Sequence, residues 1–522
     1  MTTSTDGALD TSAIGTAINE TTIADLQAGL AAGRFTVRQL AEACLARIAA
    51  LDHSGPTLRS VIELNPDALA IADALDAERA AGSLRGALHG IPILLKDNID
   101  TADQMLTTAG SLALTRSCPV QDATVAARLR AAGALILGKT NLSEWANFRS
   151  TRSSSGWSAR GGQTKNPHVL DRNPCGSSAG SAVAVAASLC AAAVGTETDG
   201  SIVSPSALCG VVGLKPTVGL TSRAGIVPIS PTQDTAGPHA RSVADAALLL
   251  TAMRGPDPRD PATVASAEHA HTDYSRFLDR DGLRGARIGV MREPGTIGYN
   301  RHADAVFHTA LTQLTTLGAE LVDPLPLTAS ENYLQGDEFT VLLYEFKQAM
   351  ADYLATRVPH PDHPTATVPR SLAELIAFNQ EFAALELRYF GQEIFELSEA
   401  KGGLESPEYL EALSRSRDGT RGLIDQAMTA HRLDAIVAVT MAPAWTTDLL
   451  NGDRLSGGSS SFAARAGYPL ITLPAGHAFG LPVGITFMGE AFSEATLIRL
   501  AYAFEQGTMA RRVPGYLPTL SM

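Results

Sequence analysis

Two segments rich in serine and glycine carry residues that could attack a carbonyl carbon. The first reads G-S-S-A-G over residues 176–180 and matches a pattern in which the central serine, here Ser178, is a nucleophile. The second reads T-D-G-S over residues 198–201. A glycine at position 200 permits a turn whose successive backbone N–H groups bind an oxyanion beside Ser201. Both segments therefore point to acyl transfer, although either could also be an ordinary capped turn.

The first segment matches the nucleophile turn of α/β-hydrolases only in part. That turn follows a strand directly, whereas residues 161–175 contain two prolines and have the composition of a loop. Residues 182–194 are small and apolar and predict a buried helix. We therefore expect a loop that enters a helix N-terminus, where free N–H groups and the helix dipole favour negative charge. A hydrolase that uses Ser178 with Asp434 and His477 stays open as an alternative.

A third match, G-A-L-I-L-G-K-T over residues 133–140, satisfies the phosphate-loop pattern. A phosphate loop needs a strand before its first glycine and a helix after its last residue. Here Asp122 is placed to cap a helix over residues 123–132 that Gly133 ends, and residues 135–137 form the strand. Because this order is inverted, we expect a helix C-terminus followed by a core strand and not a nucleotide site.

Lys96 is a candidate base for a serine nucleophile. It follows five apolar residues, 91–95, which predict a buried strand that ends at the lysine. Only a neutral lysine accepts a proton, and keeping a lysine neutral at pH 7 costs about 4–5 kcal/mol from its free pKa. Burial disfavours the ammonium form and so lowers the pKa. The alternative is a lysine that reaches solvent or pairs with Asp97 or Asp100.

Helical and strand-like segments alternate along the chain. Helical periodicity runs from residue 22 to about residue 81, and short apolar runs follow it. Runs of the same kind return late in the sequence and could join one sheet, at residues 287–291, 435–439, 470–473 and 484–488. We predict an α/β fold in which a single large domain, residues 1–522, has a central mixed β-sheet covered by helices on both faces. Its expected parts are an N-terminal helical layer (22–81), a core with the candidate catalytic residues (87–254), a helical cap (333–432), and C-terminal strands with a helix (433–515).

The composition excludes several classes of function. The 522 residues carry a net charge of −13 without a basic run, so we do not expect nucleic-acid binding. The five cysteines are scattered and include no C-x-x-C pair, which favours reduced thiols over a disulfide framework or a zinc site. No stretch is long and apolar enough to span a membrane, and the first residues lack the pattern of a signal peptide. We expect a cytoplasmic globular protein.

Four segments, taken in order, resemble the motifs of the amidase signature family. They are K-D-N at residues 96–98, C-G-S-S-A-G-S at 175–181, T-D-G-S-I at 198–202, and C-G-V-V-G-L-K-P-T at 209–217. The resemblance extends over residues 87–489, about three quarters of the chain, and the number of ordered motifs makes it specific. It implies the amidase signature fold and hydrolysis of amides with no cofactor and no metal.

The resemblance also implies a role for individual residues. In that family a lysine, a serine on a cis peptide bond and a second serine form a Ser-Ser-Lys triad, and by motif these are Lys96, Ser177 and Ser201, with Gly176 and Ser178 as neighbours. Ser201 would attack the amide, Ser177 would pass its proton towards Lys96, and water would later clear the acyl group. The oxyanion hole would be formed by the backbone N–H groups of Thr198, Asp199, Gly200 and Ser201.

Two residues depart from the commonest pattern of the family. Asp199 stands where glycine is usual, and Val203 replaces a frequent arginine. A carboxylate beside an oxyanion opposes catalysis, so we expect Asp199 to turn to a hydrogen bond or to the substrate. The T-E-T-D-G-S-I sequence resembles the peptide amidase branch, which removes the amide of C-terminally amidated peptides and releases ammonia. Three further segments also resemble that branch, at residues 62–67, 96–100 and 141–147.

Other functions within the resemblance stay open. The family also contains amidases of small aliphatic and aryl amides, enzymes of fatty amides, and amidotransferase subunits that need a partner protein and ATP. A peptide substrate requires an open polar cleft, which we expect the helices of residues 333–432 and the stretch 441–458 to line. The expected partner is a small-molecule or short peptide amide, bound by a monomer or a homodimer.

Overall fold

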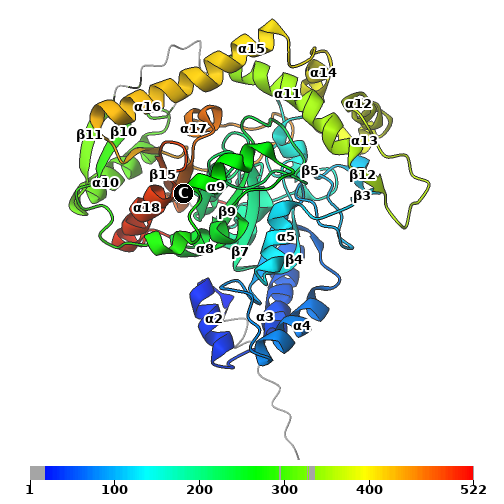
Figure 1. Cartoon of the computed structure of the whole chain (residues 1–522), viewed down its shortest axis with the longest axis horizontal. Coiled ribbons are helices and arrows are strands. Elements are labelled where there is room, and N and C mark those ends of the chain that lie inside the picture. The colour runs from blue at the N-terminus through cyan, green and yellow to red at the C-terminus, as the bar shows by residue number, and fades with distance from the viewer. Residues whose placement is uncertain (1–17, 293–295, 326, 328–335, 521–522) are drawn as a thin grey trace, which may run out of the picture.

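A β-sheet of eleven strands runs through the centre of the molecule (Figure 1). The computed structural model describes residues 18–292, 296–325, 327 and 336–520. The α/β class, with one mixed sheet at the centre of one large domain, is confirmed. In spatial order the sheet contains β1 (Val61–Leu64), β4 (Leu135–Thr140), β2 (Pro92–Lys96), β7 (Ala192–Glu197), β9 (Thr235–Ala240), β8 (Val212–Lys215), β14 (Leu470–Ala478), β15 (Leu481–Met488), β13 (Ala435–Val439), β10 (Arg287–Met291) and β11 (Glu320–Leu325).

The sheet contains parallel and antiparallel pairs. β4, β2 and β7 are parallel to one another, as are β13, β10 and β11, and the remaining neighbours are antiparallel. In the register of β2 and β7, Leu95 lies opposite Val194. Lys96 and Thr196 therefore both lie at the carboxyl ends of parallel strands, which is where open α/β sheets place their functional sites.

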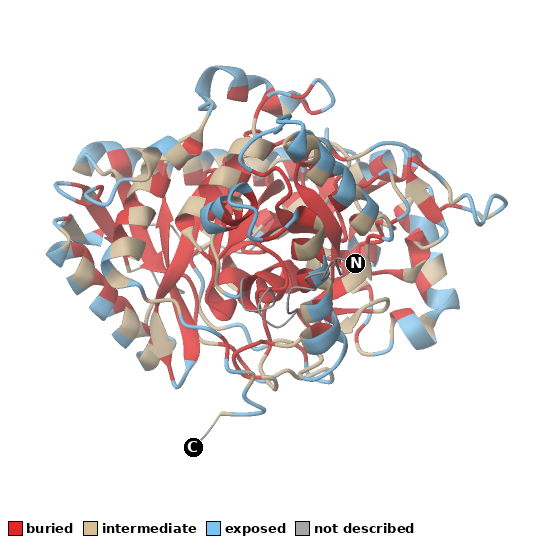
Figure 2. Cartoon of the chain, turned by 90° about the horizontal axis from the view of Figure 1, so that it is seen from below, coloured by how far each residue is buried: buried red, intermediate tan, exposed pale blue. Residues whose placement is uncertain are grey.

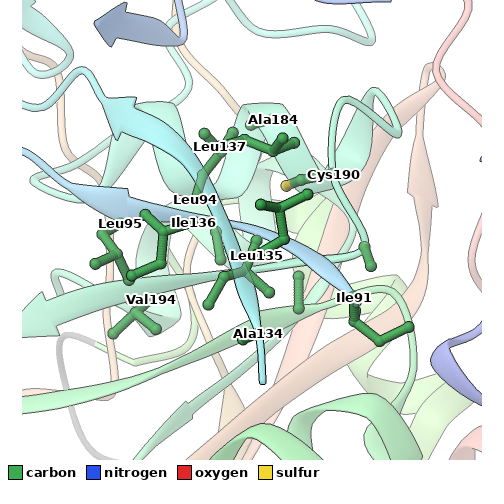
Figure 3. Packing of buried hydrophobic residues seen from close by; sticks show 14 of the residues in the cluster. Ile91, Leu94, Leu95, Ala134, Leu135, Ile136, Leu137, Ala184, Cys190 and Val194 are labelled. Atoms are coloured by element: carbon green, nitrogen blue, oxygen red, sulfur yellow. The ribbon is translucent and has the colours of Figure 1, made fainter. Parts of the chain in front are cut away.

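The parallel strands β2, β4 and β7 are buried on both faces. Residues 93–95, 135–137 and 192–194 have exposed fractions of at most 1%. Figure 3 shows Leu94, Leu135 and Val194 among the buried side chains that fill the space around these strands. Uninterrupted apolar runs of this kind are typical of parallel strands covered from both sides. Lys96 thus continues a strand that is fully removed from water.

Helices cover both faces of the sheet, as predicted. Side chains along β13 alternate between two clusters of buried residues, with Val437 in one and Ile436 in the other. Figure 2 shows the buried strands between helices whose outer surfaces are exposed. One face is covered by α8 (Val243–Met253), α10 (Arg301–Thr316) and α18 (Glu494–Thr508), and the other by α7 (Val203–Cys209), α16 (Gly419–His431) and α17 (Ser461–Ala466).

The N-terminal segment consists of helices, the turns that connect them, and one strand. Its helices are α2 (Ile23–Ala31), α3 (Val37–Arg47), η1 (Ile48–His53) and α4 (Ala68–Ala80), which lie at the lower end of Figure 1. The predicted helical layer over residues 22–81 is wrong at β1, which pairs with β4 at the sheet edge. The β-branched residues Val61 and Ile62 favour a strand there, and pairing with the sheet outweighs the weaker local preference.

Residues 336–431 are mainly helical, and residues 333–335 of the predicted cap lie outside the described residues. In Figure 1 these helices form the upper rim of the molecule. The longest of them, α11, packs against α14 and α15. Their bounds are α11 (Gly336–Ala355), α12 (Leu372–Glu381), α13 (Ala383–Glu386), α14 (Glu393–Glu399), α15 (Pro407–Leu413) and η7 (Ser414–Asp418), followed by α16.

The predicted buried helix over residues 182–194 is wrong in its second half. The helix α6 (Ala179–Ala186) is shorter, and residues 192–194 belong to β7 instead. The chain reverses between them at Ser188, which has a φ of 54°. A run that is apolar at every position has no period, so it cannot distinguish a buried helix from a turn followed by a buried strand. The turn with Ser201 consequently follows a strand and not a helix.

The predicted cap at Asp122 is also wrong. The helix α5 (Thr124–Ala131) begins after Ala123, and no side chain caps it. Asp122 instead accepts a hydrogen bond from the backbone N–H of Ala102 and one from Arg130 Nε. The carboxylate therefore binds a neighbouring loop and an arginine of the helix, and it does not bind the backbone at the helix N-terminus as the local sequence predicted.

The segment of residues 133–140 is a core strand, as predicted, because β4 occupies its last six residues. A Cβ on Gly138 would lie 2.3 Å from the carbonyl oxygen of Glu63, so the glycine permits β1 to approach β4. Lys139 is fully buried, and its Nζ donates to Ile99 O at 2.7 Å and to Thr107 Oγ1 at 2.8 Å. Gly138 and Lys139, two of the residues that define the phosphate-loop pattern, thus have structural roles in the core.

Shorter elements connect these layers. They are η2 (Leu112–Leu114), β3 (Ser117–Pro119), η3 (Glu144–Asn147), β5 (Trp157–Ser158), β6 (Gly162–Gln163), η4 (Pro261–Ala265), α9 (Ser266–His269), η5 (Tyr274–Phe277) and β12 (Arg357–Pro359).

Among the described residues, no helix combines the length and the apolar character that a membrane span requires.

A pair of glycine substitutions tests the contact between β1 and β4. Gly138→Ala should lower the free energy of unfolding by about 1–3 kcal/mol, because the new methyl group collides with the backbone of Glu63. Gly422→Ala, in the exposed face of α16 with no atom within 4 Å of the new Cβ, should raise it by about 0.5–1 kcal/mol. Urea unfolding measures both changes, and equal effects of the two substitutions would contradict the close approach of the strands.

Candidate active site

The amine of Lys96 lies in a fully buried cluster of hydroxyl and carbonyl groups. Its Nζ is 2.7 Å from Ser177 Oγ, 2.8 Å from Thr196 Oγ1 and 3.3 Å from Thr196 O. Lys96 is 0% exposed and Ser177 1% exposed. A neutral amine has two N–H donors and one lone pair, and the carbonyl can only accept, so one of the two hydroxyl groups donates to the neutral lysine. The cluster is therefore built to exchange a proton between Lys96 and a hydroxyl group.

Burial lowers the pKa of Lys96 to about 7. The nearby carboxylates of Asp234 and Glu197 act in the opposite direction, since a negative charge favours the ammonium form. Near neutral pH the amine is consequently present in both protonation states, which is the condition for a general base. The prediction of a buried strand that ends in a desolvated lysine agrees with this geometry.

Ser177 lies in the loop that precedes α6. Its backbone carbonyl accepts a hydrogen bond from the N–H of Ser143 at 3.0 Å. The peptide bond between Gly176 and Ser177 is cis, as the resemblance to the amidase signature family implies. A Cβ on Gly176 would lie 2.1 Å from Ser143 Oγ, so only glycine fits beside Ser143.

Ser178 connects this loop to the turn that contains Ser201. Its backbone N–H donates to Ser201 O at 3.1 Å, and its hydroxyl group donates to Thr196 O at 3.0 Å while accepting from Thr196 N at 3.2 Å. Both bonds of the hydroxyl group are thus made with the backbone of β7. Ser178 has the surroundings of a structural connector.

The alternative triad of Ser178 with Asp434 and His477 is not assembled. Asp434 accepts a hydrogen bond from the backbone N–H of Arg287, and the ring of His477 lies beside that of His168. Each of the three residues therefore has separate partners in a different part of the fold.

The turn after β7 presents unused backbone donors. Among the described residues, the N–H groups of Thr198, Asp199, Gly200 and Ser201 donate to no protein acceptor. Gly200 has a φ of 78°, a conformation that glycine adopts readily. Successive free N–H groups next to a serine form the geometry of an oxyanion hole. These residues also line a cavity of about 630 Å³.

Two carboxylates that the sequence analysis did not single out support this turn. Glu197 Oε2 accepts hydrogen bonds from the N–H groups of Ile202 and Val203, at 2.7 and 3.0 Å. Asp234 accepts from Thr198 Oγ1 at 2.5 Å, and burial raises its pKa to about 6. No spacing in the sequence connects Asp234 to the turn, because the pairing of β9 with β7 brings it there.

The carboxylate of Asp199 is occupied by hydrogen bonds, as one of our expectations required. Its two oxygens accept from Ser460 Oγ at 2.5 Å and from Ser461 Oγ at 2.6 Å, at the start of α17. Val203, the second departure from the family pattern, is buried in the first turn of α7 and donates its N–H to Glu197. Neither departure removes an N–H group from the turn.

The cavity in front of Ser201 is bounded by distant parts of the chain. The predicted lining stretch, residues 441–458, contributes Met441, Leu455, Gly457 and Gly458, and α11 contributes Leu342. Tyr299 and Leu455 are 62% and 59% exposed, so apolar side chains lie where the cavity opens to solvent. A second cavity of about 540 Å³ reaches Asn98, Thr196 and Asp234.

Comparison with known proteins identifies the family. The sequence model of the Amidase family matches residues 39–498. The chain belongs to the amidase signature family. Over 508 residues this amidase is 44% identical to an Arabidopsis thaliana protein described as a probable amidase, with 96% of this chain and 92% of that protein covered. It is 37% identical over 505 residues to a component of the glutamyl-tRNA(Gln) amidotransferase of Chloroflexus aurantiacus, with 94% and 98% covered.

Solved structures show the same fold. The amidase has a TM-score of 0.89 and 53% identity to the native peptide amidase of Stenotrophomonas maltophilia, with 95% of this chain and 99% of that chain covered. An amidase family protein of Bacillus anthracis gives a TM-score of 0.86 at 35% identity, with 97% and 95% covered. These likenesses, together with the family match, make the protein a hydrolase that acts on amides.

Replacing Lys96 by Met should change how the free energy of unfolding depends on pH. A lysine whose pKa falls from 10.5 to about 7 on folding binds more protons in the unfolded state between these values. Stability therefore rises with pH in this window, and between pH 7 and pH 9 the wild-type protein should gain about 2 kcal/mol relative to Lys96→Met. Urea unfolding at both pH values measures this difference. The partly exposed Lys347 provides the matched variant Lys347→Met, and an identical pH response of both variants would contradict the lowered pKa of Lys96.

Proposed function

We propose that this amidase removes the terminal amide of C-terminally amidated peptides through an acyl-enzyme on Ser201. The observation that carries the catalytic part is the buried contact of 2.7 Å between Lys96 Nζ and Ser177 Oγ, next to a turn with free N–H groups. The support for a peptide substrate is the 53% identity to a peptide amidase over 95% of the chain.

In the proposed reaction, Ser201 Oγ attacks the carbonyl carbon of the carboxamide. Its proton passes to Ser177 Oγ while Ser177 gives its own proton to the neutral amine of Lys96. The negative charge that forms on the carbonyl oxygen is stabilised by the backbone N–H groups of residues 198–201. The C–N bond then breaks, the relay returns the proton to the leaving nitrogen, and ammonia departs. Water attacks the remaining ester by the same relay, and the peptide leaves as a carboxylic acid.

The cavity supports a substrate larger than a small amide. Its volume of about 630 Å³ lies within the range of sites for drug-sized ligands. Its wall combines Ser155, Ser204 and Ser460 with the apolar side chains of Phe148 and Ile229. A peptide amide presents backbone donors and acceptors as well as side chains, and this mixed lining complements both. A fatty amide would require a uniformly apolar wall.

The compartment and the assembly belong to the same proposal. The five cysteines are free thiols, which supports the expected cytoplasmic location. A peptide amide is the proposed binding partner of the site, which we expect to work in a monomer or a homodimer.

Rates of ammonia release from a panel of amides test the substrate class. We expect the kcat/KM for N-acetyl-Gly-Phe amide to exceed those for propionamide, an anilide and oleamide by about 100-fold, because only the peptide fills the mixed cavity and uses its remote contacts. Faster turnover of propionamide or the anilide would indicate a small-amide amidase, and faster turnover of oleamide a fatty-amide enzyme. Ammonia release that requires ATP and a second protein would indicate an amidotransferase component.

Two serine substitutions test the assignment of the nucleophile. Ser201→Ala should lower kcat for the peptide amide by about 10³-fold or more, because the acyl-enzyme can no longer form. Ser178→Ala removes two neutral hydrogen bonds with the backbone of β7, each worth about 1 kcal/mol of stability, and should change kcat within about tenfold because these bonds do not contact the reacting atoms of the proposed mechanism. The reverse order of effects, with an acyl group found on Ser178 by mass spectrometry, would contradict the role of Ser201.

A further inference from the structure

The carboxylate of Asp199 belongs to the wall of the active-site cavity, two residues before Ser201. Hydroxyl groups of Ser460 and Ser461 hold one oxygen each, at 2.5 and 2.6 Å. Asp199, both of these serines and Ser201 all line the same cavity. The carboxylate is therefore fixed in the wall of the cavity that Ser201, the serine acylated in the proposed reaction, also lines.

The cationic side chains near Asp199 interact mainly with other carboxylates. Arg465 also lines the cavity, but its Nε donates to Glu338 Oε2 at 3.0 Å. Burial and the nearby charge of Asp199 raise the pKa of Glu338 to about 7. Lys215 is fully buried, and Glu197 and Glu494 influence it more strongly than Asp199 does. Among the ion pairs of the described residues, none includes Asp199.

We propose that Asp199 determines which chain end the site accepts, by disfavouring a carboxylate at the reacting carbon while tolerating a neutral carboxamide. This inference rests on the proposed peptide amidase function. A carboxamide carries N–H donors and no charge, whereas a carboxylate has only acceptors and is repelled by a second carboxylate. Peptides with a free C-terminus, including the product of the proposed reaction, would therefore bind weakly.

The arrangement explains how an aspartate is compatible with an oxyanion hole. The charge of the tetrahedral intermediate is concentrated on one oxygen, which the free N–H groups of residues 198–201 can surround. A product carboxylate shares its charge between two oxygens, and only one of them can occupy the hole. The second oxygen then remains in the cavity whose wall contains Asp199. Repulsion acts more strongly on the product than on the intermediate, and this difference favours product release.

Binding measurements on a variant without turnover test the proposal. In the Ser201→Ala background, we would measure Kd by calorimetry for N-acetyl-Gly-Phe amide and for N-acetyl-Gly-Phe acid. The acid should bind at least about tenfold more weakly than the amide, and adding Asp199→Asn should bring the ratio of the two Kd values close to one. Asp199→Glu keeps the charge and should keep most of the discrimination. Higher ionic strength should tighten binding of the acid more in the chain with Asp199 than in Asp199→Asn, because in that variant it screens only the repulsion by the remaining negative charges.

Asp257→Asn is the matched control, because Ser222 and Thr124 donate hydroxyl hydrogen bonds to Asp257 away from the active-site cavity. It should leave the ratio of Kd values unchanged. Equal binding of acid and amide to the chain with Asp199, or a ratio that Asp199→Asn does not alter, would overturn the inference. Failure of the wild-type enzyme to release ammonia from the same amide would instead overturn the proposed function. A lower kcat of Asp199→Asn with an unchanged ratio of Kd values would assign the residue a structural role only.

Discussion

The removal of one lysine amine from water is the constraint on which the rest of the site depends. Lys96 ends a strand whose preceding side chains are fully buried, and within the described part of the chain its amine forms hydrogen bonds with Ser177 and Thr196. Desolvation favours the neutral amine, and only the neutral amine can accept a proton. The proposed chemistry therefore depends on the strand, because a lysine on a solvated strand end would keep its proton at neutral pH.

The sheet holds the other groups in register with this amine. The parallel pairing of β2 and β7 places Thr196 beside Lys96, and the antiparallel pairing of β9 places Asp234 beside the turn that follows β7. Ser178 then ties the loop of Ser177 to the same turn through the backbone carbonyl of Ser201. Ser177 and Ser201 are thus held by strand ends and by backbone hydrogen bonds, which is the kind of support that the proposed catalytic geometry requires.

Most of the sheet and part of the site could be predicted from the sequence. The apolar run before Lys96 identified a buried strand correctly because burial on both faces leaves an uninterrupted signal. The same lack of period made residues 182–194 ambiguous, and there the helix prediction failed for residues 187–194. The motif around Ser178 indicated that residue as a nucleophile, whereas the family resemblance pointed to Ser177, whose hydroxyl group is the one in contact with the amine of Lys96. Asp234 could not be found, because its position depends on strand pairing between segments 38 residues apart at Glu197 and Thr235.

Two opposing effects set the proton affinity of Lys96, and neither could be read from local sequence. Burial alone would drive the pKa of the amine downward, while the carboxylates of Asp234 and Glu197 raise it. These carboxylates are buried themselves, and their hydrogen bonds with Thr198, Ile202 and Val203 favour their charged forms. The carboxylates that hold the turn of residues 198–201 are thus the same groups that limit the fall in the pKa of Lys96, the proposed base. Replacing either carboxylate would therefore change both the hydrogen bonds of the turn and the pKa of Lys96, so the proposed oxyanion hole and the proposed proton relay are coupled.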